Sequence, residues 1–159
     1  MIKFKMTRLY PYSLILAFVY LSCILAFPSS SYAGDTITSN IRVIHATSDG
    51  HPHIDPGLND LAHQLQSVFK YTSYRLLDSK EISIANNTTG SLSLPGSRVL
   101  QIIPGGMSGD RIKFAIRILK NRSQVFTTQI LLKNGSSVTI GGPDFKNGYL
   151  LFNISGISH

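Results

Sequence analysis

The residues best suited to chemistry are histidines and aspartates gathered in one early stretch. Four of the five histidines fall within nineteen residues, in the set His45, Asp49, His51, His53, Asp55, Asp60 and His63. His51 and His53 are two residues apart, so an extended backbone points both imidazoles to the same side. A third ligand from His45, His63 or Asp49 would complete a site for Zn²⁺, Cu²⁺ or Ni²⁺. This spacing predicts a candidate metal site that uses His51, His53 and His45.

The same histidines also fit a purely structural role. A His-x-His pair in a polar loop is a weakly specific pattern. His45 falls on a predicted strand, where a half-buried histidine with one hydrogen bond is the common case. His63 falls in the middle of a predicted helix, where it would face solvent or cap the core. The structural role is the favoured interpretation and metal binding is the alternative, so we expect no cofactor unless it is one of these metals.

Motifs of catalysis are missing from the sequence. It contains no Gly-x-Ser-x-Gly, no His-Glu-x-x-His and no Gly-x-x-x-x-Gly-Lys-Ser/Thr. Glu81 is the only glutamate, so a site built on paired carboxylates would require two distant aspartates to converge. The glycine-rich segment 104–109 lacks the following helix that an anion cradle requires, and it is interpreted as a hairpin loop. We therefore expect a non-enzymatic protein.

A basic strand face is the second candidate surface. Arg111, Lys113 and Arg117 alternate with apolar residues, so a strand would present all three on one side. Lys120 and Arg122 would extend this surface around the next turn. Such a surface could bind anionic lipid head groups, acidic polysaccharide or an acidic patch on another protein, although a simply solvated face is the plainer account. No nucleic acid is expected, because aromatic residues are not interleaved with the cations.

Two tyrosines could anchor a protein partner. Tyr71 and Tyr74 are three residues apart just after the predicted helix, and tyrosines often anchor protein interfaces. Strand alternation could instead put one in the core and the other at the rim. We expect a binding or assembly domain that contacts an envelope protein partner through the basic strand face and these tyrosines. A metal-binding envelope protein is the alternative.

The first 33 residues are typical of a cleavable signal peptide. Lys3, Lys5 and Arg8 precede an apolar run over 14–27, and Ser31-Tyr32-Ala33 puts small residues where a signal peptidase would cut before Gly34. The apolar run has fourteen residues, fewer than the ~20 that cross a bilayer as a helix. We expect a periplasmic or secreted protein with no transmembrane span after cleavage.

Removal of residues 1–33 would leave a single domain, 34–159, without cysteine. Cys23 is the only cysteine, so disulfides, thiolate catalysis and Cys-ligated metals would be excluded together. Small exported eukaryotic domains commonly depend on disulfides, which favours a bacterial envelope here. The mature chain would carry 12 basic and 8 acidic residues, a mild excess of positive charge.

Hydrophobic periodicity predicts one helix among many strands. A strand is expected at Ile41–Ala46, followed by an amphipathic helix with Asp55 as N-cap and Pro56 in its first turn, ending near Lys70. Further strands are expected at 71–77, 81–85, 91–94, 98–103, 111–120, 124–132, 136–140 and 149–154, with turns that include 104–106 and 141–143. The fold class is α+β, mostly an antiparallel β-sheet or sandwich with one amphipathic helix after the first strand. The opening strand, helix and strand could instead form a βαβ-like unit with parallel pairing.

Overall fold

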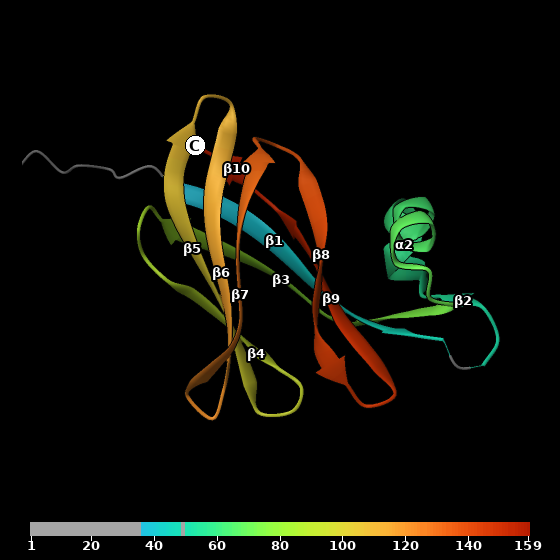
Figure 1. Ribbon diagram of the computed structural model, residues 1–159. Coiled ribbons are helices and arrows are strands. Elements are labelled where there is room, and N and C mark those ends of the chain that lie inside the picture. The colour runs from blue at the N-terminus through green and yellow to red at the C-terminus, as the bar shows by residue number, and fades with distance from the viewer. Residues whose placement is uncertain (1–35, 49) are drawn as a thin grey trace, which may run out of the picture. The chain divides into compact units, whose positions relative to one another are not determined.

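A computed structural model describes residues 36–48 and 50–159. The predicted signal peptide, residues 1–33, and Asp49 lie outside the described residues. The elements in chain order are β1 (Thr36–Thr47), β2 (His53–Ile54), the 3₁₀ helix η1 (Pro56–Leu61), α2 (Ala62–Phe69), β3 (Ser73–Ala85), β4 (Gly90–Leu94), β5 (Arg98–Ser108), β6 (Arg111–Lys120), β7 (Ser123–Lys133), β8 (Ser137–Phe145), β9 (Gly148–Ser155) and β10 (Ile157–Ser158) (Figure 1).

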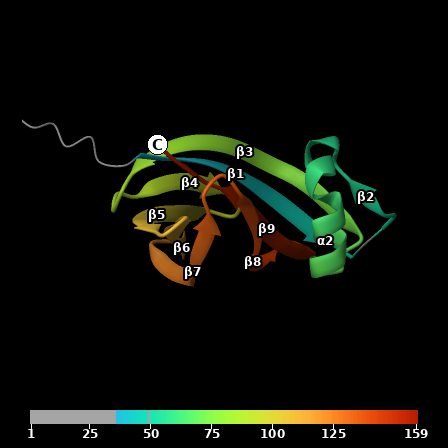
Figure 2. The ribbon, with the colours of Figure 1, turned by 90° about the horizontal axis from the view of Figure 1, so that it is seen from above.

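The strands form two sheets. Sheet A has the order β2-β3-β1-β9-β8, with β10 also pairing with β1, and sheet B has the order β4-β5-β6-β7. Every strand pair is antiparallel except the short β2–β3 pair. The two sheets lie in separate layers, and α2 lies toward one end of sheet A (Figure 2). The predicted fold class, a mostly antiparallel α+β sandwich with one short helix after the first strand, is confirmed.

The main core fills the space between the two sheets. Period-two alternation sends Ile112, Phe114, Ile116 and Ile118 of β6 inward, and all four are at most 1% exposed. They pack in one cluster with residues from sheet A that include Ile37, Ile41, Val43, Leu150, Phe152 and Ile154. We call the face of sheet A that carries these residues its inner face.

A second, smaller core lies on the opposite face of sheet A. Ile44 and Ala46 of β1 alternate with the inner-face residues and pack under the two short helices. Leu58 of η1 and Leu65 of α2 are both 0% exposed and cover Tyr74 and Leu151 in the same cluster. One end of sheet A is therefore covered by helices on the face away from sheet B.

Of two predictions about the first elements, one was wrong and the other was confirmed only in part. β1 pairs antiparallel with β3, so the βαβ-like alternative fails. The helix begins as a 3₁₀ turn, in which the Leu58 N–H donates to the Asp55 carbonyl at 2.9 Å. Asp55 occupies the predicted N-cap position and Pro56 the first turn. Asp55 provides no side-chain cap, however, because its carboxylate binds His53 and the Leu76 N–H instead.

Several strand boundaries in the structure also differ from the predicted ones. The predicted strands 71–77 and 81–85 are joined in one strand, β3, which begins at Ser73, because Asp78, Ser79 and Lys80 continue to pair with β1. The predicted turns at 104–106 and 141–143 lie inside β5 and β8 at register shifts, and the chain turns at 109–110 and 146–147 instead. Glycines here serve β-bulges and close approach: a Cβ on Gly142 would clash with the Phe152 ring and the Leu150 carbonyl.

Candidate functional site

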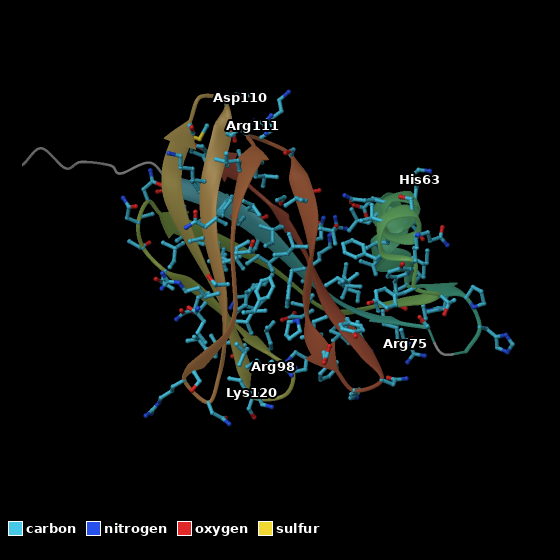
Figure 3. The ribbon with its side chains drawn as sticks, in the orientation of Figure 1. His63, Arg75, Arg98, Asp110, Arg111 and Lys120 are labelled. Carbon is cyan, nitrogen blue, oxygen red and sulfur yellow. The ribbon has the colours of Figure 1, made fainter. Side chains whose placement is uncertain are left out.

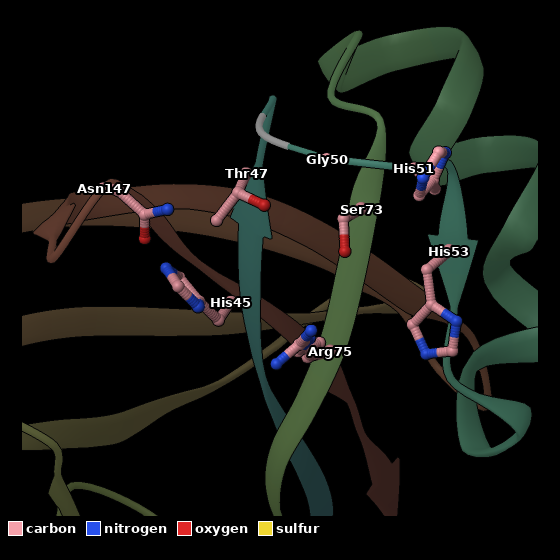
Figure 4. A pocket seen from close by; sticks show the side chains of 8 residues that line it. All are labelled: His45, Thr47, Gly50, His51, His53, Ser73, Arg75 and Asn147. Carbon is pink, nitrogen blue, oxygen red and sulfur yellow. The ribbon is translucent and has the colours of Figure 1, made fainter.

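A polar pocket of about 460 Å³ lies where β1, β2 and β3 meet. The strand register builds it: His45 of β1 is opposite Arg75 of β3, and Thr47 is opposite Ser73. Ser73 is in turn opposite His53 of β2. The lining residues are His45, Thr47, Gly50, His51, His53, Ser73, Arg75 and Asn147 (Figure 4).

The pocket continues the inner face of sheet A beyond the apolar core. His45 has the same strand parity as Ile41 and Val43, and its ring meets the Phe145 ring edge-on with centroids 5.2 Å apart. Phe145 also packs against the main core. His45 and Phe145 therefore form the border between core and pocket. The expected single hydrogen bond of His45 is confirmed, since its Nε2 has one partner, the Phe145 carbonyl at 3.2 Å. The side chain is buried rather than half-buried, at 9% exposed.

His53 is held by the aspartate that was expected to cap the helix. Its Nε2 lies 2.7 Å from Asp55 Oδ1, and Asp55 Oδ2 accepts the Leu76 N–H at 2.8 Å. The hydrogen bond from His53 is the main cause that lowers the pKa of Asp55, with the Leu76 N–H adding to it against the opposing effect of burial. This carboxylate ties β2 and the start of η1 to β3.

Arg75 is a candidate site residue that the sequence analysis missed. It lines the pocket from β3, between His45 of β1 and His53 of β2 (Figure 4). It is exposed and has no ion pair within 4.0 Å among the described residues. No local pattern marks it, because it becomes a neighbour of His45 only through a strand pairing across 30 residues of sequence.

The three histidines of the metal prediction do line one pocket. Among the described residues, however, no group of three or more His, Cys, Asp or Glu side chains is arranged to hold a metal ion. Two other members of the early cluster point elsewhere. Asp60 forms an ion pair with Arg42 at 2.7 Å, which lowers the pKa of this aspartate. His63 is exposed on α2 (Figure 3). Metal binding stays a prediction.

The basic strand face lies on the outer face of sheet B, which we define as the face away from sheet A. Arg111, Lys113 and Arg117 of β6 are exposed while the residues between them are buried or half-buried. Arg111 lies at one end of β6 and Lys120 at the other (Figure 3). The register adds Lys133 of β7, opposite Arg111, which the sequence analysis did not include in this face.

An apolar groove of about 720 Å³ accompanies these cations. It is lined by Ile103, Ala115 and Leu131 as well as Lys113. Gly105 also lines the groove. A Cβ at this position would occupy part of the groove without a clash, because it would lie 3.6 Å from the Lys113 Cβ, an ordinary contact distance. Leu131 is 55% exposed. The face therefore combines positive charge with accessible apolar surface.

Charge is divided unequally between the two sheets. Residues 90–133, which contain sheet B, carry seven basic residues and one acidic residue, Asp110. The rest of 34–159 carries five basic and seven acidic residues. Asp110 compensates little, because it lies 3.9 Å from Arg111 and both side chains are more than half exposed. Residues 34–159 have only a mild excess of positive charge, but the segment that contains sheet B is strongly basic.

The two tyrosines have different roles. Tyr74 is 0% exposed, and its hydroxyl donates to the Leu65 carbonyl at 2.8 Å and accepts the Tyr71 N–H at 3.1 Å. Its prediction as a partner contact was wrong, because strand alternation turns it under the helices. Tyr71 lies at the rim, with its ring centroid 5.7 Å from that of the 43% exposed Tyr149. Burial, with smaller effects of Tyr149 and Asp144, raises the pKa of Tyr71.

Within residues 36–48 and 50–159, no helix has the length and apolar character that crossing a membrane takes. Neither a protein-family model nor a curated protein matches the chain. A cryo-EM structure of the T2SS secretin XcpQ from Pseudomonas aeruginosa is similar with a TM-score of 0.43 and 10% identity, over 95% of this chain. The chain spans 64% of the length of that protein chain. A similarity this weak carries no conclusion about the present protein.

Proposed function

We propose that this chain is an exported, non-enzymatic binding domain of a bacterial envelope that holds an acidic protein partner against the outer face of sheet B. The division of charge carries the proposal: Arg111, Lys113, Arg117 and Lys133 are exposed on this face, and Asp110 is the only acidic residue within residues 90–133. A surface of one sign attracts and orients partners of the opposite sign. Export rests on the signal-peptide pattern of residues 1–33.

The apolar groove favours a protein over a lipid head group or a polysaccharide. Protein interfaces combine an apolar centre with a charged rim, and an aromatic or aliphatic side chain commonly fills a pocket at the centre. Here Ile103, Ala115 and Leu131 line the groove, while Arg111 and Arg117 lie further along the same face of β6. A polysaccharide or a head group would use the cations and leave the groove empty.

The state of the early aspartates supports a non-enzymatic role. Asp55 is bound to His53 and Asp60 to Arg42, and these contacts lower the pKa of both carboxyls. A carboxylate with a lowered pKa is a weak general base near neutral pH. Both aspartates instead join elements, since Asp55 links β2 to β3 and Asp60 links η1 to β1.

The partner can be identified by photo-crosslinking the full chain in its own host. A photoreactive residue at Thr127, opposite Arg117 on the outer face of sheet B, should crosslink to one acidic envelope protein. The matched control is the same residue at Glu81, exposed on β3 of sheet A, and it should not crosslink to that protein. Crosslinks from Thr127 that lead only to lipid or polysaccharide would contradict the proposal.

The purified partner then allows the face to be tested by affinity. Binding should weaken between about 0.05 and 0.5 M salt, because exposed charges are screened over that range. Gly105→Val should weaken binding about 10-fold by filling the groove, and its Cβ meets nothing closer than 3.6 Å. An affinity that changes neither with salt nor in Gly105→Val would contradict the proposed binding surface.

A further inference from the structure

The polar pocket beside β1, β2 and β3 lies on a different surface from the proposed partner face. Its volume of about 460 Å³ is within the range of small-molecule sites, about 300–1,000 Å³. The outer face of sheet B comprises residues of β5, β6 and β7, whereas the pocket is lined by β1, β2, β3 and the 146–147 turn. The question is which ligand chemistry the pocket residues fit.

The described lining offers hydrogen-bond donors and positive charge. Arg75 supplies a guanidinium with no ion pair among the described residues. Thr47 and Ser73 supply hydroxyls from opposite positions on β1 and β3, and Ser73 is 5% exposed. His51 and His53 contribute imidazoles from the neighbouring segment. None of the described residues that line the pocket is acidic.

This composition disfavours a metal cation and suits an oxyanion. A guanidinium in the lining would repel Zn²⁺ or Cu²⁺, and arginine has no lone pair to offer a metal. The same fork of N–H donors matches the paired oxygens of a phosphate or a carboxylate. Hydroxyls from Thr47 and Ser73 can donate to the remaining oxygens. The Asp55 carboxylate, which contacts His53, is also bound to the Leu76 N–H.

We propose that this pocket binds a small ligand through a phosphate or carboxylate group, with Arg75 as its principal contact and Thr47, Ser73 and His51 as additional donors. The strand register fixes the positions of three of these residues. Arg75 belongs to one pair of the β1–β3 ladder, and Ser73 and Thr47 form the pair two positions further along, so the Cα positions of all three do not depend on the loop. The volume exceeds that of a bare phosphate, so the oxyanion is one part of a larger small molecule.

Calorimetric titration of the tag-free exported chain tests the site with two probes, inorganic phosphate and succinate. One of them should bind saturably with a Kd of about 1 mM or tighter, and which one binds identifies the oxyanion. Arg75→Gln should weaken this binding about 10-fold or more, and the affinity of Arg75→Lys should lie between those of Arg75→Gln and the unmodified chain. The matched control Arg117→Gln removes the same charge from the outer face of sheet B and should leave Kd unchanged.

Zinc supplies the opposing outcome. Loss of the Arg75 charge should weaken the binding of an oxyanion but strengthen the binding of a cation. If the pocket is a metal site, Arg75→Gln should therefore raise the affinity for Zn²⁺. The proposal is overturned if neither probe binds with a Kd below about 10 mM, if Arg75→Gln and Arg117→Gln weaken binding equally, or if Zn²⁺ binds and phosphate and succinate do not. A thermal midpoint of Arg75→Gln close to that of the unmodified chain verifies folding, as expected for an exposed side chain without an ion pair.

Discussion

The two ends of sheet A share the same strands but have different surroundings. At one end the inner face meets sheet B, and Ile37, Ile41 and Val43 of β1 are all 0% exposed. At the other end the helices cover the opposite face, and the inner face carries His45, Thr47, Ser73 and Arg75. The polar pocket thus forms where sheet A extends beyond sheet B (Figure 1). One sheet can serve as core and as binding surface when the layer that covers it is shorter.

The largest effect should come from the sandwiched end. Phe152 is 0% exposed in the main core, so Phe152→Ala should lower the free energy of unfolding by about 3–5 kcal/mol. Urea denaturation measures this loss. A loss below about 1 kcal/mol would mean that the two sheets are not packed against each other as described.

The helix-covered end should respond more moderately. Tyr74→Phe removes the hydroxyl that joins the Leu65 carbonyl to the Tyr71 N–H, and leaving buried groups unpaired costs about 1–3 kcal/mol. Tyr71→Phe is the matched control. Because Tyr71 lies at the rim, this substitution should lower the free energy of unfolding by less. Equal losses in the two variants would contradict the burial of Tyr74 under α2.

The link between β2 and β3 should make stability depend on acid. Because the pKa of Asp55 is lowered in the fold, its contribution is present above the unfolded value of about 4 and is lost as pH falls toward the lower folded value. Asp55→Asn should therefore show a smaller loss of stability than the unmodified chain below pH of about 4. Urea midpoints of the two proteins from pH about 7 down to 2.5 measure this difference. If the midpoints of both proteins fell equally with pH, the link between β2 and β3 would be contradicted.

The smallest effect on stability should come from the outer face of sheet B. Lys113 and Arg117 are exposed and have no ion pair among the described residues, so Lys113→Gln and Arg117→Gln should each change stability by less than about 0.5 kcal/mol. Thermal denaturation checks this. A large loss in either variant would mean that these cations serve the fold rather than a partner.

Local alternation was enough to predict the sandwiched end. The apolar positions of β6 are separated by basic ones, so Ile112, Phe114, Ile116 and Ile118 could be assigned to the core directly. Turn residues were less informative. Gly105 and Gly142 read as turns in the sequence but lie within strands, because glycine also serves bulges and close backbone approach.

The helix-covered end depended on contacts that sequence patterns do not contain. Asp55 has the type and position of an N-cap, yet the Leu76 N–H and His53 compete for its carboxylate. Arg75 was overlooked as a site residue because its proximity to His45 depends on the register between β1 and β3. The histidines were identified by residue type, but the ligand chemistry proposed for their pocket depends on that arginine.

The central claim is that the partner binds to the cations on the outer face of sheet B and does not simply respond to the net charge of the protein. The most direct measurement compares partner affinity for Arg111→Gln/Lys113→Gln/Arg117→Gln with that for Lys70→Gln/Lys80→Gln/Lys146→Gln, which removes three charges from elements outside sheet B. The first variant should bind about 10- to 100-fold more weakly, and the second should bind like the unmodified chain. Equal weakening in both would show that only total charge matters and would contradict the claim.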